Sequence, residues 1–452
     1  MRILADTRPG FHLVRGAAGS GKTTTALLRL RQLCATRLSR RERLQLVDPV
    51  RVLVLTYNKT LQGYVGELAR QQVSGSPGLI LHVSTFSKWA VGMVGNEGLV
   101  DRERTRPAIG SLAASVPLPI DFVIDEVEYL MGRFRPDELE DYLGARREGR
   151  GQAPRVERAL RQRLLTDVVL PYIAHKEKQG WRDWNDIAAE AALVEGYPAW
   201  DVVIVDEAQD FSANQVRAIA AHVGAEHTTT FVMDATQRIY PRFFTWPEAG
   251  VQLVNSHVLR SNYRNTRQVA AFARGLVEGL PNEDDGSLPD FHASDRDGPL
   301  PTVAVGRFGA QVRYAIRRLR TEIDLTSESV AFLHPKGGGW FDHLRQELDR
   351  EGIAWCDLTR ASGWPSGPES VALCTIHSAK GLEFDHVFML GLNQQVTPHG
   401  DEEGDAMLDM LRRLLAMGVG RSRETVTLGY KADDPSTLIN LLAVGTYKEV
   451  RL

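Results

Sequence analysis

The chain reads Gly16-Ala17-Ala18-Gly19-Ser20-Gly21-Lys22-Thr23 close to its amino terminus. This stretch fits the phosphate-loop pattern G-x-x-x-x-G-K-[ST], in which glycines let the backbone curl so that successive N–H groups point at one phosphate. Residues 11–14 predict a short buried strand before the loop. Apolar residues at helical spacing, from Ala26 to Leu38, predict a helix after it. Because strand, loop and helix in this order are the context that the motif requires, we expect a nucleotide site rather than a chance glycine-rich turn.

Each part of this loop has an expected role in holding ATP and Mg²⁺. Lys22 is expected to reach the β- and γ-phosphates, and the Thr23 hydroxyl to bind Mg²⁺. The positive amino-terminal end of the following helix also favours a phosphate. The predicted nucleotide-binding residues of this stretch are Gly16, Ala17, Ala18, Gly19, Ser20, Gly21, Lys22, Thr23 and Thr24.

A second motif lies where the buried strand predicted at residues 201–205 ends, in Asp206-Glu207-Ala208-Gln209-Asp210. A phosphate-loop ATPase needs an acidic pair at such a place. Asp206 is expected to hold Mg²⁺ and Glu207 to polarise the attacking water. Residues 122–126, Phe-Val-Ile-Asp-Glu, look similar but lack the following Gln and Asp. We therefore expect a structural role for Asp125 and Glu126.

The order of the apolar stretches predicts the fold class. Predicted strands alternate with helices, which favours α/β domains built on parallel, doubly wound sheets. Ligands bind such sheets at the carboxyl ends of the strands. Further strands are predicted at residues 51–57, 79–83, 229–233, 303–305, 330–333, 371–375, 386–390 and 425–430.

The segment at 92–200 has a different character, because it is rich in Arg and Glu and has helices predicted at 136–143, 155–175 and 184–194. We interpret it as a helical insertion in the first sheet domain. Its arginines could contact phosphates, or they could simply cover a solvated helical surface. The predicted organisation is therefore a first α/β domain at 1–91 and 201–262, the insertion at 92–200, and a second α/β domain at 263–452.

Composition narrows the class of protein. The chain has 452 residues, a net charge of −3 and three cysteines without zinc spacing. These values predict a cytoplasmic protein with reduced thiols, no signal peptide and no membrane partner. Any nucleic-acid binding must come from a local groove, because the overall charge is not basic. The basic run from Arg37 to Arg43 is interpreted as a solvated loop rather than a DNA-binding patch.

Further motifs follow the phosphate loop in a fixed order, and together they resemble the motif series of superfamily 1 helicases of the UvrD/Rep/PcrA type. Residues 262–264 (Asn-Tyr-Arg) and 375–384 match two of these motifs closely. In two others the chain departs from the family pattern, with Met233 in place of a glycine and Gly420 in place of a threonine. The other stretches that resemble the family are 54–59, 83–86, 205–210, 234–240 and 418–423.

The resemblance implies two RecA-like domains with ATP bound between them. Gln237 would sense the γ-phosphate, and Arg264 and Arg421 would act as arginine fingers, a task that suits a planar and permanently charged group. Tyr263 would stack on the adenine. Gly381 and Glu383 would complete the nucleotide site, with Glu383 near the ribose. The residues implied to line a single DNA strand are Thr56, Tyr57, Lys59, Thr85, Phe86, Tyr240 and His377; for each aromatic taken alone, core packing is the alternative.

Two departures from the family leave the exact activity open. No Gln precedes the first strand to read the adenine edge, which predicts relaxed base selectivity. The second unit leaves no room for the family's large insertion. Compact chains of this kind resemble, in size and type, the helicase-like subunit of the Gabija antiphage system, which partners a nuclease. The sequence therefore predicts a DNA translocase or 3′-to-5′ helicase. The alternative is a nucleotide-sensing regulatory subunit of an antiviral nuclease, and a small-molecule kinase is disfavoured.

Overall fold

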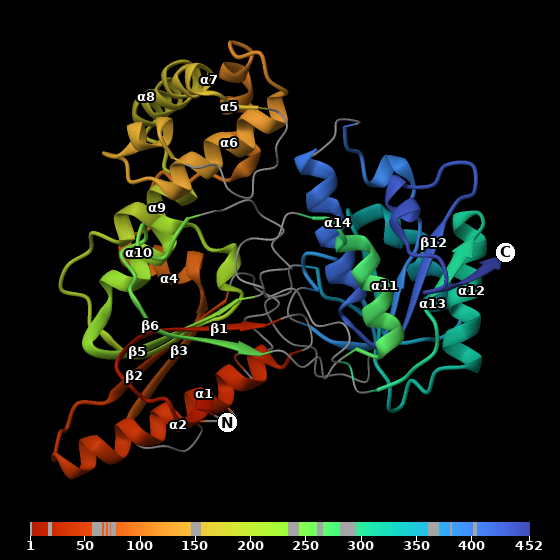
Figure 1. Cartoon of the computed structure of the whole chain (residues 1–452), viewed down its shortest axis with the longest axis horizontal. Helices are drawn as coiled ribbons and strands as arrows, with labels where there is room; N and C mark the ends of the chain where they lie inside the picture. The colour runs from red at the N-terminus through yellow and green to blue at the C-terminus, as the bar shows by residue number, and fades with distance from the viewer. Residues whose placement is uncertain are drawn as a thin grey trace.

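A computed structural model of the chain shows two α/β units and a separate group of helices (Figure 1). The structure describes residues 2–16, 20–56, 66, 69–70, 73, 78–145, 155–233, 244–259, 265–280, 294, 296–359, 370–379, 382–400 and 405–452. Within these ranges, no helix is long and apolar enough to cross a membrane.

The first unit is built on a six-stranded sheet with the strand order β3-β2-β4-β5-β1-β6. Every pairing is parallel, as the sequence predicts. Strand β4 in the sheet interior is almost continuously buried, as expected where helices cover both faces of a parallel sheet. The strands are β1 (Gly10–Gly16), β2 (Val50–Thr56), β3 (Leu79–Thr85), β4 (Trp200–Val205), β5 (Val223–Met233) and β6 (Leu253–Leu259).

Helices cover both faces of this sheet. On one face α2 (Lys22–Arg43) packs its apolar stripe against β2, β4 and β5. The other face is covered by α4 (Phe86–Val94), α9 (Trp184–Ala191) and α10 (Ala213–Ala221), which share one core with β1, β2, β4 and β5. A short helix, α1 (Arg2–Ala5), precedes β1.

The basic run that ends α2 is helical to Arg43, so the expectation of a loop there is wrong. Its arginines have acidic partners on the sheet. Arg41 binds both carboxylate oxygens of Asp201 at 3.0 and 2.9 Å, and Arg40 pairs with Glu226. Both hydrogen bonds come from Arg41 Nη2, and charge-assisted pairs of this kind help to hold the helix against the sheet beyond the predicted boundary at Leu38.

The helices at residues 102–179 form their own core (Figure 1), in which Tyr142 and Tyr172 are fully buried. One continuous run comprises α7 (Arg158–Arg163), a π-helical segment (Leu164–Val169) and α8 (Leu170–Gln179). Pro171 lies just after the π segment and lacks an N–H, so the wider turn accommodates the missing bond. The remaining elements are α5 (Arg102–Ala113), α6 (Ile120–Arg133) and a 3₁₀ turn (Leu139–Leu143).

These helices are fastened to the sheet unit at the carboxyl end of α6. The side-chain amide of Asn214, on α10, donates to the carbonyl oxygens of Met131 and Phe134, both at 2.9 Å. Arg217 donates to the carbonyl oxygen of Arg133 at 2.8 Å. The carbonyls at the end of α6 are thereby satisfied from the sheet unit.

The second unit has a seven-stranded sheet with the order β13-β7-β12-β11-β8-β10-β9, and it is also parallel throughout. The sequence predicted five of its strands but not β9 or β13, which are short edge strands. The strands are β7 (Thr302–Val305), β8 (Val330–His334), β9 (Trp355–Asp357), β10 (Val371–Thr375), β11 (Phe384–Met389), β12 (Ser422–Tyr430) and β13 (Lys448–Arg451). Its helices are α11 (Arg267–Val277), α12 (Phe308–Thr321), α13 (Asp342–Arg350) and α14 (Ala406–Val419).

Candidate nucleotide site at the carboxyl edge of the first sheet

The phosphate-loop sequence begins at the end of β1 and runs into the start of α2. Gly21 has φ 75°, a left-handed conformation that favours glycine, and α2 begins at Lys22. A Cβ on Gly16 would lie 2.2 Å from Ser20 Oγ and 3.0 Å from the carbonyl oxygen of Leu259. Both glycines are therefore required by the backbone path. The predicted strand–loop–helix order is confirmed at its two ends, whereas Ala17, Ala18 and Gly19 lie outside the described residues.

The acidic motif meets this loop across the sheet. The Thr23 hydroxyl donates to Asp206 Oδ2 at 3.1 Å, and Asp206 Oδ1 accepts the backbone N–H of Glu207 at 3.0 Å. Residues 183 positions apart in the sequence thus lie in direct contact. A hydroxyl beside a carboxylate, at the amino-terminal end of a helix, supplies two oxygen ligands that suit Mg²⁺.

Glu207 has an unusual backbone. Its φ is 54°, one of two positive values among non-glycine residues of the described chain, and its side chain is buried. The side-chain amide of Gln209 donates a hydrogen bond to Glu207 Oε2. A non-glycine residue held in the left-handed region is strained, and such strain is concentrated at functional sites. The turn therefore fixes where the Glu207 carboxylate lies.

The Asp206 carboxylate is costly to ionise where it lies. Burial, followed by the neighbouring Glu207, raises the pKa of Asp206 above its ordinary value, while the Thr23 hydrogen bond and Lys22 oppose that shift. Two buried carboxylates with one nearby lysine form a site that a divalent cation would stabilise, because the cation supplies the missing positive charge. The donor set fits Mg²⁺ on this ground.

In the second unit, Arg421 lies at the end of the segment joining α14 to β12. It is almost wholly buried, and its guanidinium donates to the carbonyl oxygens of Met417 at 3.1 Å and Leu382 at 3.3 Å. Glu383, which the resemblance places near the ribose, accepts two hydrogen bonds from Arg423 at 3.2 and 3.0 Å.

Asn265 is a residue that the sequence reading missed. Its side-chain amide donates to the carbonyl oxygens of Gly420 at 3.3 Å and Ser422 at 2.5 Å, one on each side of Arg421. Asn265 directly follows Arg264, so it ties one predicted arginine segment to the other. Only the position of Asn265 next to the Asn262-Tyr263-Arg264 motif could have indicated this role.

The residues expected to hold a DNA strand have different surroundings. Thr56 and Thr85 are paired across β2 and β3 at the carboxyl edge, and both are buried. The Thr85 hydroxyl accepts the N–H of Lys88 and so caps α4. Phe86 packs edge-on against Trp89 and Phe211 in the core. The expectation that Phe86 stacks on a base therefore does not fit this conformation, because its ring fills the core.

His377 lies in a tight turn after β10. In this turn the Thr375 hydroxyl donates to Ser378 Oγ at 3.0 Å and accepts the Ser378 N–H at 3.1 Å. Several predicted site residues lie outside the described residues, so the structure says nothing of their contacts. They are Tyr57, Lys59, Gln237, Tyr240, Tyr263, Arg264 and Gly381.

The similar acidic pair, Asp125 and Glu126, lies in the middle of α6 and not at a strand end. Glu126 is buried and accepts a hydrogen bond from the Tyr142 hydroxyl at 2.7 Å. Asp125 is partly exposed and pairs with Arg106 at 3.4 Å. Both contacts are structural, as the sequence predicts.

We expect Asp125→Asn to leave ATP turnover within about twofold of the parent chain. A surface ion pair contributes only about 0–1 kcal/mol to stability, so the substitution should also fold normally. Steady-state ATP hydrolysis by the purified variant, alongside its thermal melting curve, checks this. Loss of turnover in a folded Asp125→Asn chain would mean that the catalytic acidic pair had been assigned to the wrong residues.

The sequence of this chain is similar to those of known helicases. Residues 359–432 match the family model of the UvrD-like helicase C-terminal domain. The ATP-dependent DNA helicase UvrD2 of Mycobacterium tuberculosis is 25% identical over 380 residues, covering 58% of this chain and 53% of that protein. A probable DNA helicase of Mycoplasma pneumoniae is 23% identical over 237 residues, covering 50% of this chain and 42% of that protein.

A short segment is more similar to a third relative. The ATP-dependent DNA helicase Rep of Escherichia coli is 36% identical over 59 residues, covering 13% of this chain and 9% of that protein. The chain spans about half the length of the first relatives that it matches. In sequence, and in its two parallel α/β units, the chain is UvrD/Rep/PcrA-like, similar to the superfamily 1 helicases.

Proposed function

We propose that this chain is an ATP-hydrolysing motor that moves along single-stranded DNA in the 3′-to-5′ direction. The observation that carries the proposal is the Thr23–Asp206 hydrogen bond of 3.1 Å, which joins the phosphate loop to the acidic motif at one edge of the sheet. The names of the relatives, ATP-dependent DNA helicases, support the nucleic-acid substrate. The direction rests on the family resemblance alone.

In this proposal the first unit binds and orients ATP. The N–H groups at the start of α2 and the Lys22 ammonium hold the β- and γ-phosphates. Thr23 and Asp206 would hold Mg²⁺, whose charge offsets that of the phosphate oxygens. Glu207, fixed by its turn and by Gln209, orients the attacking water. Burial strengthens each of these electrostatic contacts.

Hydrolysis is then completed from the second unit. We assign Arg264 and Arg421 to the γ-phosphate as arginine fingers, Gln237 to the sensing of that phosphate, and Tyr263 to the adenine. Two of the five N–H donors of the Arg421 guanidinium hold the carbonyls of Met417 and Leu382, which fixes the position of this side chain in the second unit.

The proposed DNA path follows the carboxyl edge of both sheets. Tyr57, Tyr240 and His377 are assigned to stacking on bases, and Lys59 to a phosphate. Such contacts are tolerant of sequence, which suits a motor. Thr56 and Thr85 lie on this edge, and Phe86 is assigned to holding Thr85 in place from the core.

We expect efficient movement on single strands but poor strand separation by the isolated chain. Opening a base-pair step costs about 1.4 kcal/mol, and unwinding also needs a surface that engages the duplex ahead of the motor. The helices at 102–179 are the candidate for that surface. The test is paired: displacement of streptavidin from the end of a biotinylated single strand, and separation of a duplex with a 3′ tail.

The two assays separate three outcomes. Streptavidin displacement without unwinding supports the proposal as stated, whereas robust unwinding of long duplexes by the monomer would refute its second half. ATP turnover without displacement would favour a regulatory ATPase that senses nucleotide and DNA for a partner such as an antiviral nuclease. Lys22→Ala is the control in both assays, because it should abolish displacement that depends on ATP.

A further inference from the structure

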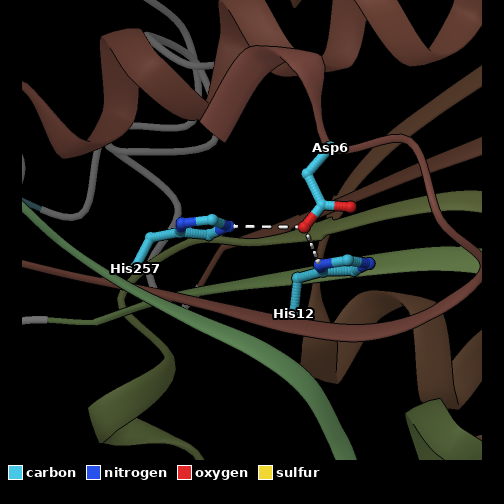
Figure 2. Close-up of side chains that lie close together, drawn as sticks. All are labelled: Asp6, His12 and His257. Carbon is cyan, nitrogen blue, oxygen red and sulfur yellow. Dashed lines mark ion pairs between the residues drawn. The ribbon is translucent and has the colours of Figure 1, made fainter. Parts of the chain in front are cut away.

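A polar cluster lies in the first sheet unit, away from the acidic motif. It comprises Asp6, which precedes β1, His12 on β1 and His257 on β6 (Figure 2). In the register of these parallel strands His12 pairs with Asn255, and Val14 pairs with His257. Because alternate residues of a strand share a face, His12, Asn255 and His257 all lie on one face of the sheet.

Both imidazoles are directed at the same oxygen of Asp6 (Figure 2). His12 Nδ1 and His257 Nε2 each lie 3.7 Å from Asp6 Oδ2, and the three atoms lie within 4.8 Å of one another. The His12 side chain is fully buried, and those of Asp6 and His257 are 9% and 13% exposed. The cluster is therefore largely shielded from water.

The hydrogen bonds around His12 decide where its proton lies. His12 Nε2 lies 2.9 Å from the carbonyl oxygen of Arg8, which can only accept, so Nε2 carries the hydrogen. In neutral His12 the lone pair of Nδ1 therefore faces the Asp6 carboxylate. Among the described residues, neither His12 Nδ1 nor His257 Nε2 has a hydrogen-bond partner. The lone pair of His12 Nδ1, facing a carboxylate oxygen at 3.7 Å, is unfavourable unless a cation lies between the two atoms.

Burial opposes protonation of the two histidines. It lowers the pKa of both rings, as does the nearby Arg29 guanidinium, while the Asp6 carboxylate raises it. Neutral histidine is the form that binds metals.

We propose that Asp6, His12 and His257 bind a divalent transition-metal ion, for which Zn²⁺ is the best fit. Zn²⁺ takes histidine nitrogens at about 2.0–2.1 Å and carboxylate oxygens at about 2.0–2.2 Å, so tetrahedral ligand atoms lie about 3.4 Å apart. The two 3.7 Å separations need only a small contraction. Water would supply the fourth ligand.

The surroundings of the cluster match those of a metal site. His12 donates its other ring N–H to a backbone carbonyl, as metal-bound histidines commonly do. Asp6 Oδ1 accepts from Arg8 Nε at 2.8 Å, and Oδ2 accepts from Arg8 at 2.7 Å and from Asn255 at 2.9 Å. The largely exposed Arg8 side chain can release Oδ2 while it keeps Oδ1. Arg29 repels a cation, so we expect weaker binding than at a four-ligand zinc site.

The ion would be structural, because it joins the segment after α1 to β1 and β6. The test uses the full chain, stripped with a chelator and titrated with Zn²⁺ in Mg²⁺ buffer without nucleotide. We expect one Zn²⁺ per chain and a rise in melting temperature of about 3 °C or more. Asp6→Asn and His257→Gln should each weaken binding at least about tenfold.

Two matched controls identify the site. His82→Gln removes a histidine on β3, and Asp206→Asn removes the carboxylate of the nucleotide site; both should bind Zn²⁺ as the parent chain does. Failure to bind Zn²⁺, or binding unchanged in Asp6→Asn and His257→Gln, would overturn the proposal. If those variants do not fold, X-ray absorption of the zinc-loaded parent chain decides: two imidazoles in the first shell support the site, and none refutes it. Because no readout depends on ATP or DNA, this test is independent of the proposed function.

Discussion

Lys22→Ala is expected to lower the rate constant of ATP hydrolysis by at least about 10²–10³-fold, the usual cost of removing one preorganised charge partner from a transition state. Lys22 is the first residue of α2 and the phosphate-loop lysine, and we assign no other cation of that loop to the β- and γ-phosphates. Steady-state ATP turnover at saturating nucleotide measures the effect. Lys178→Ala, which alters an exposed lysine at the end of α8, is the matched control and should leave turnover unchanged.

A second readout makes this prediction specific to the phosphates. Lys22→Ala should also weaken ATP binding, because the lysine contacts the phosphates before hydrolysis as well as during it. Melting curves should be close to those of the parent chain, since Lys22 lies at a helix end and not in the core. A folded variant with near-normal turnover would remove the phosphate loop from the mechanism.

Glu207→Gln is expected to bind ATP normally and to hydrolyse it at least about 10²-fold more slowly. The amide keeps the size of the side chain, and its oxygen can still accept from Gln209, so the strained turn should persist. The glutamine amide, unlike the Glu207 carboxylate, cannot accept a proton from the attacking water. Nucleotide binding measured by fluorescence, together with single-turnover hydrolysis, separates the two steps.

The control for this variant is Glu177→Gln, which changes an exposed glutamate on α8. It should affect neither binding nor hydrolysis. If Glu207→Gln lost binding and hydrolysis together, Glu207 would be a ligand or a structural residue rather than the group that orients water.

Much of the first sheet unit could be predicted from sequence because its signals are local. Buried strands such as β2 contain continuous apolar runs, here residues 52–55, and the phosphate-loop motif predicts the helix that follows it. The Thr23–Asp206 contact could also be expected, because the phosphate loop and the acidic motif each follow a predicted strand. The carboxyl ends of parallel strands lie at the same edge of a sheet.

Other features depend on contacts that sequence does not display. Residues 122–126 have the apolar pattern of a strand but lie in α6, because Val123, Ile124 and Val127 pack in the helical core. The short edge strands β9 and β13 pair on one side only and carry little apolar signal. The burial of Phe86 against Phe211 and the Asp6–His12–His257 cluster arise from tertiary packing alone.

The measurement that tests the central claim most directly is steady-state ATP turnover by the full chain with and without single-stranded DNA. Our account predicts turnover that is low alone, rises at least about tenfold with single strands of mixed sequence, and is abolished in Lys22→Ala. It also predicts no comparable rise with blunt duplex. Turnover that is indifferent to single-stranded DNA, or stimulated by blunt duplex but not by single strands, would contradict it.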